Sequence, residues 1–211
     1  MKFYQFGRSM VEMLGVLAII GVLSVGAIAG YSKAMMKYKL NKQAEQLSWL
    51  LNIMYQYKSQ WVFDDYHVSL VPYYTKMHLI PEDMLKDEVN DPESLYDVFG
   101  MRIAIATNDC YDQCSTIILS YNINSNNTFD ICQNIASTIK NFHELIERTG
   151  VQKFTTDNPT QYGHHFYGDK YCGTSSKPCL KDITLDEIAS RCSYCAESER
   201  CNFYVTYKIN D

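Results

Sequence analysis

Positions 13–32 form a run of twenty residues without a formal charge, and this run constrains the fold more than any other feature of the chain. As an α-helix rising about 1.5 Å per residue, it would span roughly the 30 Å hydrocarbon core of a bilayer. Glu12 stands immediately before the run and Lys33 immediately after it. Because a charge at the bilayer centre is costly, Glu12 must reach the membrane interface or find a partner. The run therefore predicts one membrane-spanning helix.

A glycine precedes the run at a fixed distance from the glutamate, because Glu12 is the fifth residue after Gly7. This segment resembles the processing site and N-terminal helix of type IV prepilins and the related pseudopilins. The resemblance implies that a prepilin peptidase cuts between Gly7 and Arg8 and that the new N-terminus is methylated. It also implies that Glu12 pairs with the Arg8 amine of a neighbouring subunit. An amine and a carboxylate that enter an apolar filament core together compensate each other.

Two positions depart from the pattern of that family. Arg8 stands where the family usually has a hydrophobic residue, and Ala29 stands where many pilins have a helix-kinking proline. Without that proline, local softening of the helix falls to its glycines, since glycine costs about 1 kcal/mol relative to alanine in a helix interior. The candidates are Gly21, Gly26 and Gly30. We expect Glu12 and Gly21 to take part in subunit assembly.

Two other interpretations of the N-terminal segment remain open. Lys2 and Arg8 form a thin basic region, and Ala27-Ile28-Ala29 before Gly30 matches the small-x-small pattern of a signal-peptidase site. The chain would then be a secreted, disulfide-rich binding protein. Alternatively, the run is a plain membrane anchor in which Gly26 and Gly30 contact another helix.

The residues after the run predict an extension of the helix followed by one globular domain. Apolar residues repeat at helical spacing on two adjacent faces. These are Leu40, Ala44, Leu47, Leu51 and Met54 on one face and Leu50, Ile53, Tyr57 and Trp61 on the other. We predict a leader peptide (1–7), a transmembrane and polymerisation helix (8–32), an amphipathic continuation (33–62) and a globular Cys-rich, pilin-like head (63–211). The expected fold class is α+β, with the long helix packed on a small antiparallel sheet with disulfide-rich loops.

Within the head, runs rich in Ile, Val and Tyr predict strands at 101–107, 116–122 and 203–209. Helical spacing predicts a helix over 130–148 that ends at Gly150, and a capping box at Thr184 predicts another helix starting near Leu185. Asp91-Pro92 predicts a short helix that Gly100 ends. The scattered Gly, Pro, Thr and Asp of residues 151–183 predict a long loop.

Eight cysteines follow the membrane segment, and an even number outside the cytoplasm predicts four disulfides of unknown pairing. They are Cys110, Cys114, Cys132, Cys172, Cys179, Cys192, Cys195 and Cys201. Cys192 and Cys195 form a C-x-x-C motif, but they fall near the C-terminal end of the predicted helix, where the dipole does not activate a thiolate. Neighbours on a helix are also too far apart for a disulfide. We therefore expect the two to have different partners, with Cys201 and Cys172 or Cys179 as the nearest candidates.

Composition narrows the functional classes. The formal net charge is −5 and no run of Lys or Arg is present, so no nucleic-acid partner is expected. Common catalytic motifs are missing, so we expect no enzyme activity and no cofactor. Possible metal ligands are His164-His165 near Asp169, Asp109 with Asp112, and the cysteines as zinc ligands, but no metal site is expected.

Together, these features predict a structural subunit of a type IV pilus-like filament. It would lie in the inner membrane before assembly and then in an extracellular filament, with the head available for adhesion, motility or secretion. The length of the chain and its cysteine-rich head favour the larger type IVb class. Its partners would be copies of itself, the prepilin peptidase and the membrane. The alternatives are the secreted binding protein, a pseudopilin of a type II secretion system, and an anchored thiol oxidoreductase.

Overall fold

The computed structural model describes residues 10–61, 67–85, 91–110, 114–124, 128–154, 161–196 and 200–209. The chain divides into two compact units, residues 1–39 and 40–211, and we call the second unit the head. The first element, α1 (Met10–Tyr57), is a helix of 48 residues that belongs to both units. A short 3-10 turn, η1 (Lys58–Gln60), follows it. One continuous helix therefore covers most of both the predicted transmembrane segment and its amphipathic continuation.

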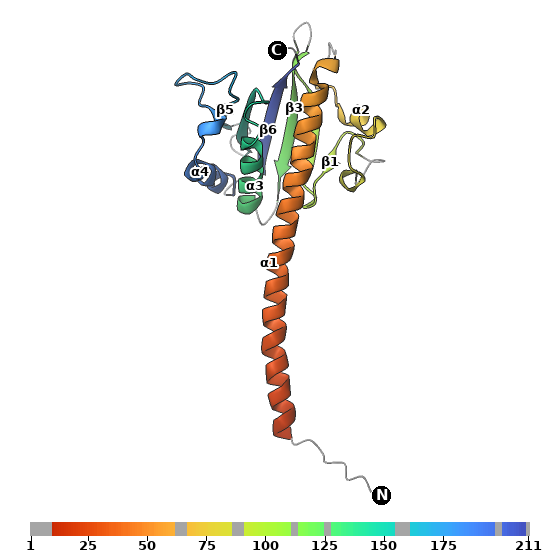
Figure 1. Cartoon of the computed structure of the whole chain (residues 1–211), viewed down its shortest axis with the longest axis vertical. Helices are drawn as coiled ribbons and strands as arrows, with labels where there is room; N and C mark the ends of the chain where they lie inside the picture. Colours follow the sequence, from red (N-terminus) through yellow and green to blue (C-terminus); the bar gives the residue numbers. More distant parts are fainter. Residues whose placement is uncertain are drawn as a thin grey trace, which may run out of the picture. The chain divides into compact units, whose positions relative to one another are not determined.

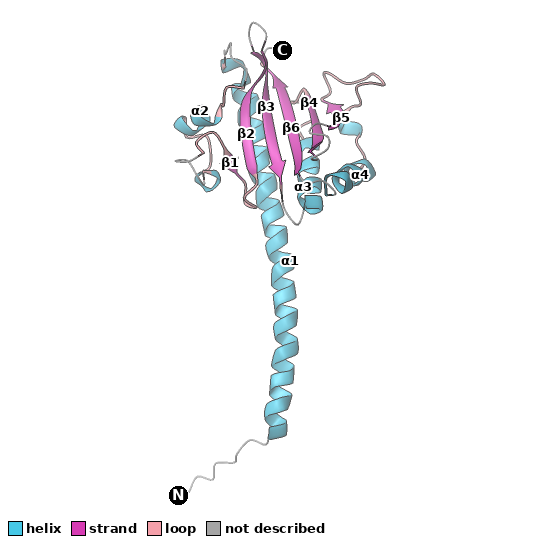
Figure 2. Cartoon of the chain, turned by 180° about the vertical axis from the view of Figure 1, so that it is seen from behind, coloured by secondary structure: helices cyan, strands magenta, loops and turns pink. Residues whose placement is uncertain are grey.

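The head is built on a six-stranded sheet whose strand order is β1-β2-β3-β6-β4-β5. All neighbouring strands are antiparallel. The last strand, β6, lies between β3 and β4, so the C-terminal segment joins the two halves of the sheet (Figure 2). The strands are β1 (Leu95–Tyr96), β2 (Arg102–Cys110), β3 (Cys114–Ile123), β4 (Arg148–Phe154), β5 (Gln161–Tyr167) and β6 (Arg200–Lys208). The predicted α+β class and antiparallel sheet are confirmed.

Helices cover one face of this sheet. The head part of α1, with α3 (Thr128–Lys140) and α4 (Leu185–Ala196), lies on the same side (Figures 1 and 2). Alternate residues of the central strands point into the core beneath these helices, as a pleated strand requires. They include Ile103, Ile105, Ile117, Leu119, Tyr121, Phe203, Val205 and Tyr207. The remaining short elements of the head are α2 (Val71–Lys76), η2 (Glu82–Met84) and η3 (Leu180–Asp182).

Both predicted apolar stripes of α1 contribute to the head core. Leu47, Leu51 and Met54 of the first stripe are buried, and so are Leu50 and Ile53 of the second. Tyr207 on β6 donates a hydrogen bond from its hydroxyl to the carbonyl of Leu51. The head of the same chain therefore buries Leu50 and Ile53 of the second stripe, and Tyr57 and Trp61 are partly buried against its core.

Three local predictions are wrong. The helix expected over 130–148 ends at Lys140, and residues 141–145 form turns with i→i−3 hydrogen bonds. These turns keep a helix-like spacing of apolar residues, which is why the sequence predicts a longer helix. The predicted loop over 151–183 contains the end of β4, all of β5 and η3. Residues 91–100 form two turns, one on each side of the two-residue strand β1, instead of a short helix.

Gly150 does not end a helix but lies within β4, opposite Tyr204 on β6. A Cβ atom at this position would stand 2.6 Å from the Tyr204 hydroxyl oxygen. The glycine therefore makes room for a tyrosine on the neighbouring strand. Glycine is common both after the end of a helix and where two strands approach closely. The prediction that Gly150 ends a helix was therefore wrong.

Candidate functional site

The segment predicted to cross a membrane displays its apolar side chains along its whole described length. The large apolar residues from Met10 to Tyr31 are between 52% and 87% exposed. Among the described residues, α1 with η1 is the one helix long and apolar enough to span a membrane. Such a surface is unstable in water and requires lipid or another protein to cover it.

Glu12 lies in the first turn of α1, is exposed, and directly precedes the uncharged run that begins at Met13. A carboxylate in the first turn of a helix is stabilised by the helix dipole. Gly7 and Arg8, the predicted cleavage and methylation residues, lie outside the described part of the chain.

Polar and small residues interrupt the apolar surface without breaking the helix. Ser24 and Ser32 donate hydrogen bonds from their hydroxyls to the carbonyls of Ile20 and Ile28, so neither brings an unsatisfied donor into an apolar environment. Apart from the local helix backbone and the two neighbouring residues, a Cβ added to Gly21 would meet no described atom within 4 Å, and the same holds for Gly15, Gly26 and Gly30. The fold of this one chain therefore does not require glycine at these positions.

A buried polar cluster fixes the head part of α1 against the sheet. Gln43 donates from Nε2 to Oδ2 of Asp97 at 2.7 Å and to the Tyr121 hydroxyl at 2.8 Å. The Tyr121 hydroxyl in turn donates to the same Asp97 oxygen. Asn134 on α3 completes the cluster, because its Nδ2 donates to Oε1 of Gln43 and to the Leu40 carbonyl. Three elements and one loop therefore meet at a single glutamine.

Asp97 is completely buried, and its other oxygen organises the turn before β2. Oδ1 accepts hydrogen bonds from the backbone N–H groups of Phe99 and Met101. Burial, and next the Asp97 carboxylate, raise the pKa of Tyr121 well above its ordinary value, so this hydroxyl keeps its proton and acts as a donor. The cluster was not predicted, although Gln43 and Gln46, two glutamines among the apolar residues of an amphipathic helix, were the available signal.

Three disulfides join the described cysteine side chains: Cys132–Cys192, Cys172–Cys179 and Cys195–Cys201. The prediction that Cys192 and Cys195 have different partners is confirmed, and Cys201 is one of those partners. The expectation that Cys172 or Cys179 would be the other is wrong. Cys192 instead binds Cys132 on α3, since α3 and α4 pack side by side. Cys110 and Cys114 are opposite each other in the register of β2 and β3, and their side chains lie outside the described part of the structure.

The disulfide pairing bears on two alternatives considered for the cysteines, thiol redox catalysis and zinc binding. The C-x-x-C motif does not close on itself, so Cys192 and Cys195 are not the two sulfurs of one redox couple. Both residues are buried, at 0% and 1% exposure. A capping box between Thr184 and Glu187 begins α4 as predicted, and the motif lies at the other end of this helix. Cysteines in disulfides are also not available as zinc thiolates.

Two of the residues considered as metal ligands in the sequence, His165 and Asp169, are described, and they contact different partners. His165 on β5 forms a hydrogen bond through Nδ1 with the Tyr204 hydroxyl. The side chains of His164 and Asp109, and all of Asp112, lie outside the described part of the chain. Asp169 instead approaches His143, whose Nδ1 lies 3.1 Å from Oδ1 of Asp169. His143 was not predicted, because it follows α3 and is distant from Asp169 in the sequence.

Comparison of the chain with protein-family models, with curated proteins and with solved structures found no match. What the structure establishes is a membrane-capable N-terminal helix that continues into an antiparallel α+β head stabilised by disulfides.

Proposed function

We propose that this protein is a structural subunit of a type IV pilus-like filament, inserted in the membrane and assembled through α1. The observation that carries the proposal is the continuity of α1, which bears an exposed apolar segment over residues 10–31 and reaches the head core with residues 47–54. The prepilin-like order of Gly7, Arg8 and Glu12 adds to it. In this proposal, lipid covers the apolar segment before assembly and other copies of the segment cover it afterwards.

The proposed assembly contact joins Glu12 to the Arg8 amine of the next subunit after cleavage at Gly7. Either charge alone would be strongly penalised in an apolar filament core, whereas the pair is compensated. The glycines of the segment allow close approach of helices, because small residues let helix backbones pack together in apolar surroundings. The head would face outward for adhesion, motility or secretion and would have no enzymatic role.

The first experiment determines the intact mass and N-terminal sequence of the protein from its native membrane. A methylated N-terminus at Arg8 supports prepilin processing. An N-terminus at Gly30 contradicts the filament proposal and favours a secreted binding protein, and an uncut Met1 favours a plain membrane anchor.

The second experiment tests the assembly contact itself. We expect Glu12→Ala to remain in the membrane but to be lost from filaments sheared off the cell. Glu45→Ala is a matched control, because Glu45 is an exposed carboxylate on the same helix with only a surface ion pair to Lys42. Normal amounts of Glu12→Ala in sheared filaments would exclude the proposed pairing.

A further inference from the structure

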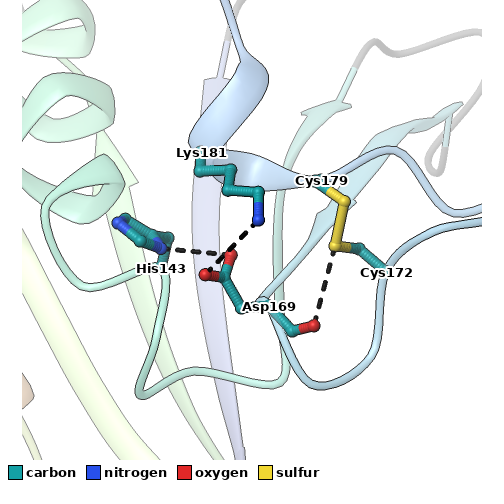
Figure 3. Close-up of a disulfide and its surroundings, with 5 residues drawn as sticks. All are labelled: His143, Asp169, Cys172, Cys179 and Lys181. Atoms are coloured by element: carbon teal, nitrogen blue, oxygen red, sulfur yellow. Dashed lines mark hydrogen bonds and ion pairs between the residues drawn. A yellow bond between two sulfur atoms is a disulfide. The ribbon is translucent and has the colours of Figure 1, made fainter.

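The turn after α3 and the loop after β5 bring together three side chains that can bind a cation. His143 and Glu144 lie in the turn, and Asp169 lies in the loop. One ligand atom from each lies within 4.8 Å of the other two. Figure 3 shows His143 and Asp169 facing each other, with the Cys172–Cys179 disulfide and Lys181 beside them.

The backbone holds these two segments at a fixed separation. Asp169 donates its N–H to the His143 carbonyl at 2.9 Å, and Gly168 donates its N–H to the Glu147 carbonyl at 2.9 Å. A Cβ on Gly168 would lie 2.0 Å from the Ile146 carbonyl oxygen, so only glycine permits this approach. The disulfide then closes the loop three residues beyond Asp169. The ligand geometry is therefore preorganised by backbone contacts and does not rest on the side chains alone.

The two central atoms have the spacing of a metal site. Nδ1 of His143 and Oδ1 of Asp169 are 3.1 Å apart, and both atoms are shielded from solvent without a hydrogen bond of good geometry among the described residues. Ligand atoms about 2.0 to 2.1 Å from a tetrahedral Zn²⁺ stand roughly 3.3 Å from each other. A cation beside these two atoms would satisfy both.

Lys181 is the competing cation. Its Nζ lies 3.7 Å from Oδ2 of Asp169, and its side chain is 49% exposed. An exposed lysine on a flexible stem can turn into water at little cost when a metal ion takes its place. The site thus has a built-in competitor for the carboxylate.

We propose that His143, Glu144 and Asp169 form a binding site for Zn²⁺ or a similar divalent transition-metal ion. One imidazole and two carboxylates are ligands of the borderline type that such ions accept, and three protein ligands leave a position for water or for a group from another molecule. The bound ion would cross-link the α3–β4 turn to the β5–η3 loop. The inference does not depend on filament assembly.

The test uses the full chain in detergent, without an affinity tag, stripped of metal with a chelator and titrated with Zn²⁺ by calorimetry. We expect one ion per chain and a rise in the thermal unfolding temperature on saturation. His143→Ala and Asp169→Asn should each weaken binding by at least about tenfold, since even the loss of an outer-shell partner costs this much. His78→Asn is the matched control, because His78 is an exposed histidine in a left-handed turn that asparagine also adopts.

Lys181→Met distinguishes a metal site from a purely structural ion pair. If the site binds metal, removing the competing ammonium should tighten Zn²⁺ binding several-fold. Absence of stoichiometric Zn²⁺ binding in both the wild-type chain and Lys181→Met overturns the proposal. Binding that survives His143→Ala unchanged, or that His78→Asn removes, overturns it as well.

Discussion

The side-chain amide of Gln43 donates a 2.7 Å hydrogen bond to Oδ2 of Asp97, which is 54 positions away in the sequence. Both residues are completely buried. Asp97 accepts further hydrogen bonds from Tyr121, Phe99 and Met101. A shift of α1 by one residue within the head would leave a buried carboxylate without this donor, which costs far more than a lost apolar contact. The pair therefore sets the register of α1 on the head.

We predict that Asp97→Ala lowers the free energy of unfolding of the head by about 3 to 5 kcal/mol, because it strands several buried donors at once. The control is Glu45→Ala, since Glu45 is 72% exposed and forms an ion pair with Lys42 at the surface, so its loss should cost less than about 1 kcal/mol. Chemical denaturation of the full chain in detergent, followed by tryptophan fluorescence, measures both values. Both tryptophans, Trp49 and Trp61, lie in the head. Equal losses for the two variants would remove the proposed register role.

Gly168→Ala should destabilise the head by about 3 kcal/mol, because the new Cβ would collide with the Ile146 carbonyl of the backbone. Gly150→Ala should cost less, since its Cβ meets the end of the Tyr204 side chain, which can move. Ser175→Ala, in an exposed turn, should change stability by less than about 0.5 kcal/mol. The same denaturation assay ranks the three variants. A Gly168→Ala protein as stable as Ser175→Ala would contradict the close approach.

The disulfides should differ in their contribution according to the loop that each closes. Cys132 and Cys192 are separated by 60 positions, and Cys172 and Cys179 by 7. Chain-entropy arguments give roughly 4 kcal/mol for the first bridge and roughly 2 kcal/mol for the second. Paired Cys→Ala variants compared by guanidinium denaturation test this order. A larger loss from removing Cys172–Cys179 would show that the short loop matters through native contacts instead.

Alkaline pH should weaken the head through its buried tyrosines. Burial raises the pKa of Tyr74 and of Tyr204 from 10.0 to about 12. Below pH 10 both residues are neutral in the folded and unfolded chains, so their full contribution to the free energy of unfolding is present. Above pH 10 the unfolded chain loses these protons first, and stability falls by about 1.4 kcal/mol per pH unit for each tyrosine until about pH 12.

Tyr74→Phe isolates this effect from that of other groups that titrate at high pH. Between pH 10 and 12, the free energy of unfolding of the variant should fall less steeply than that of the wild-type chain. The difference between the two slopes should equal the contribution of one tyrosine. Denaturation curves at several pH values measure the two slopes. Identical slopes would mean that Tyr74 ionises as readily in the folded chain as in the unfolded one.

Gly21→Leu tests whether the apolar segment packs against other copies. Apart from the local backbone of the helix and the two neighbouring residues, no described atom lies within 4 Å of the position that a Cβ would occupy, so the head should keep its stability. If helices pack closely at Gly21, the larger side chain should reduce the amount of protein in sheared filaments. Val22→Leu is the control at the adjacent, already bulky position. Filament yields that match between the two variants would remove Gly21 from the assembly contact.

Several elements of the head were predictable because they depend on local signals. Runs rich in Ile, Val and Tyr located β2, β3 and β6, and the capping box at Thr184 located the start of α4. β4 and β5 were missed because Gly150 and the polar residues around it resemble a loop in the sequence. These strands form only because β6, from the end of the chain, supplies a neighbour for β4.

Residues 12–33, read without any structure, determined that the chain has one helix able to cross a membrane, because hydropathy and length are local properties. The same reading showed that Cys192 and Cys195 need separate partners, because helical spacing is also local. Only the tertiary structure decided that Cys132 is the partner of Cys192, that Asp97 meets Gln43, and that His143 meets Asp169. Each of these pairs joins residues that are distant in the chain, and contacts of this kind depend on how helices and strands pack, which no local pattern of residues encodes.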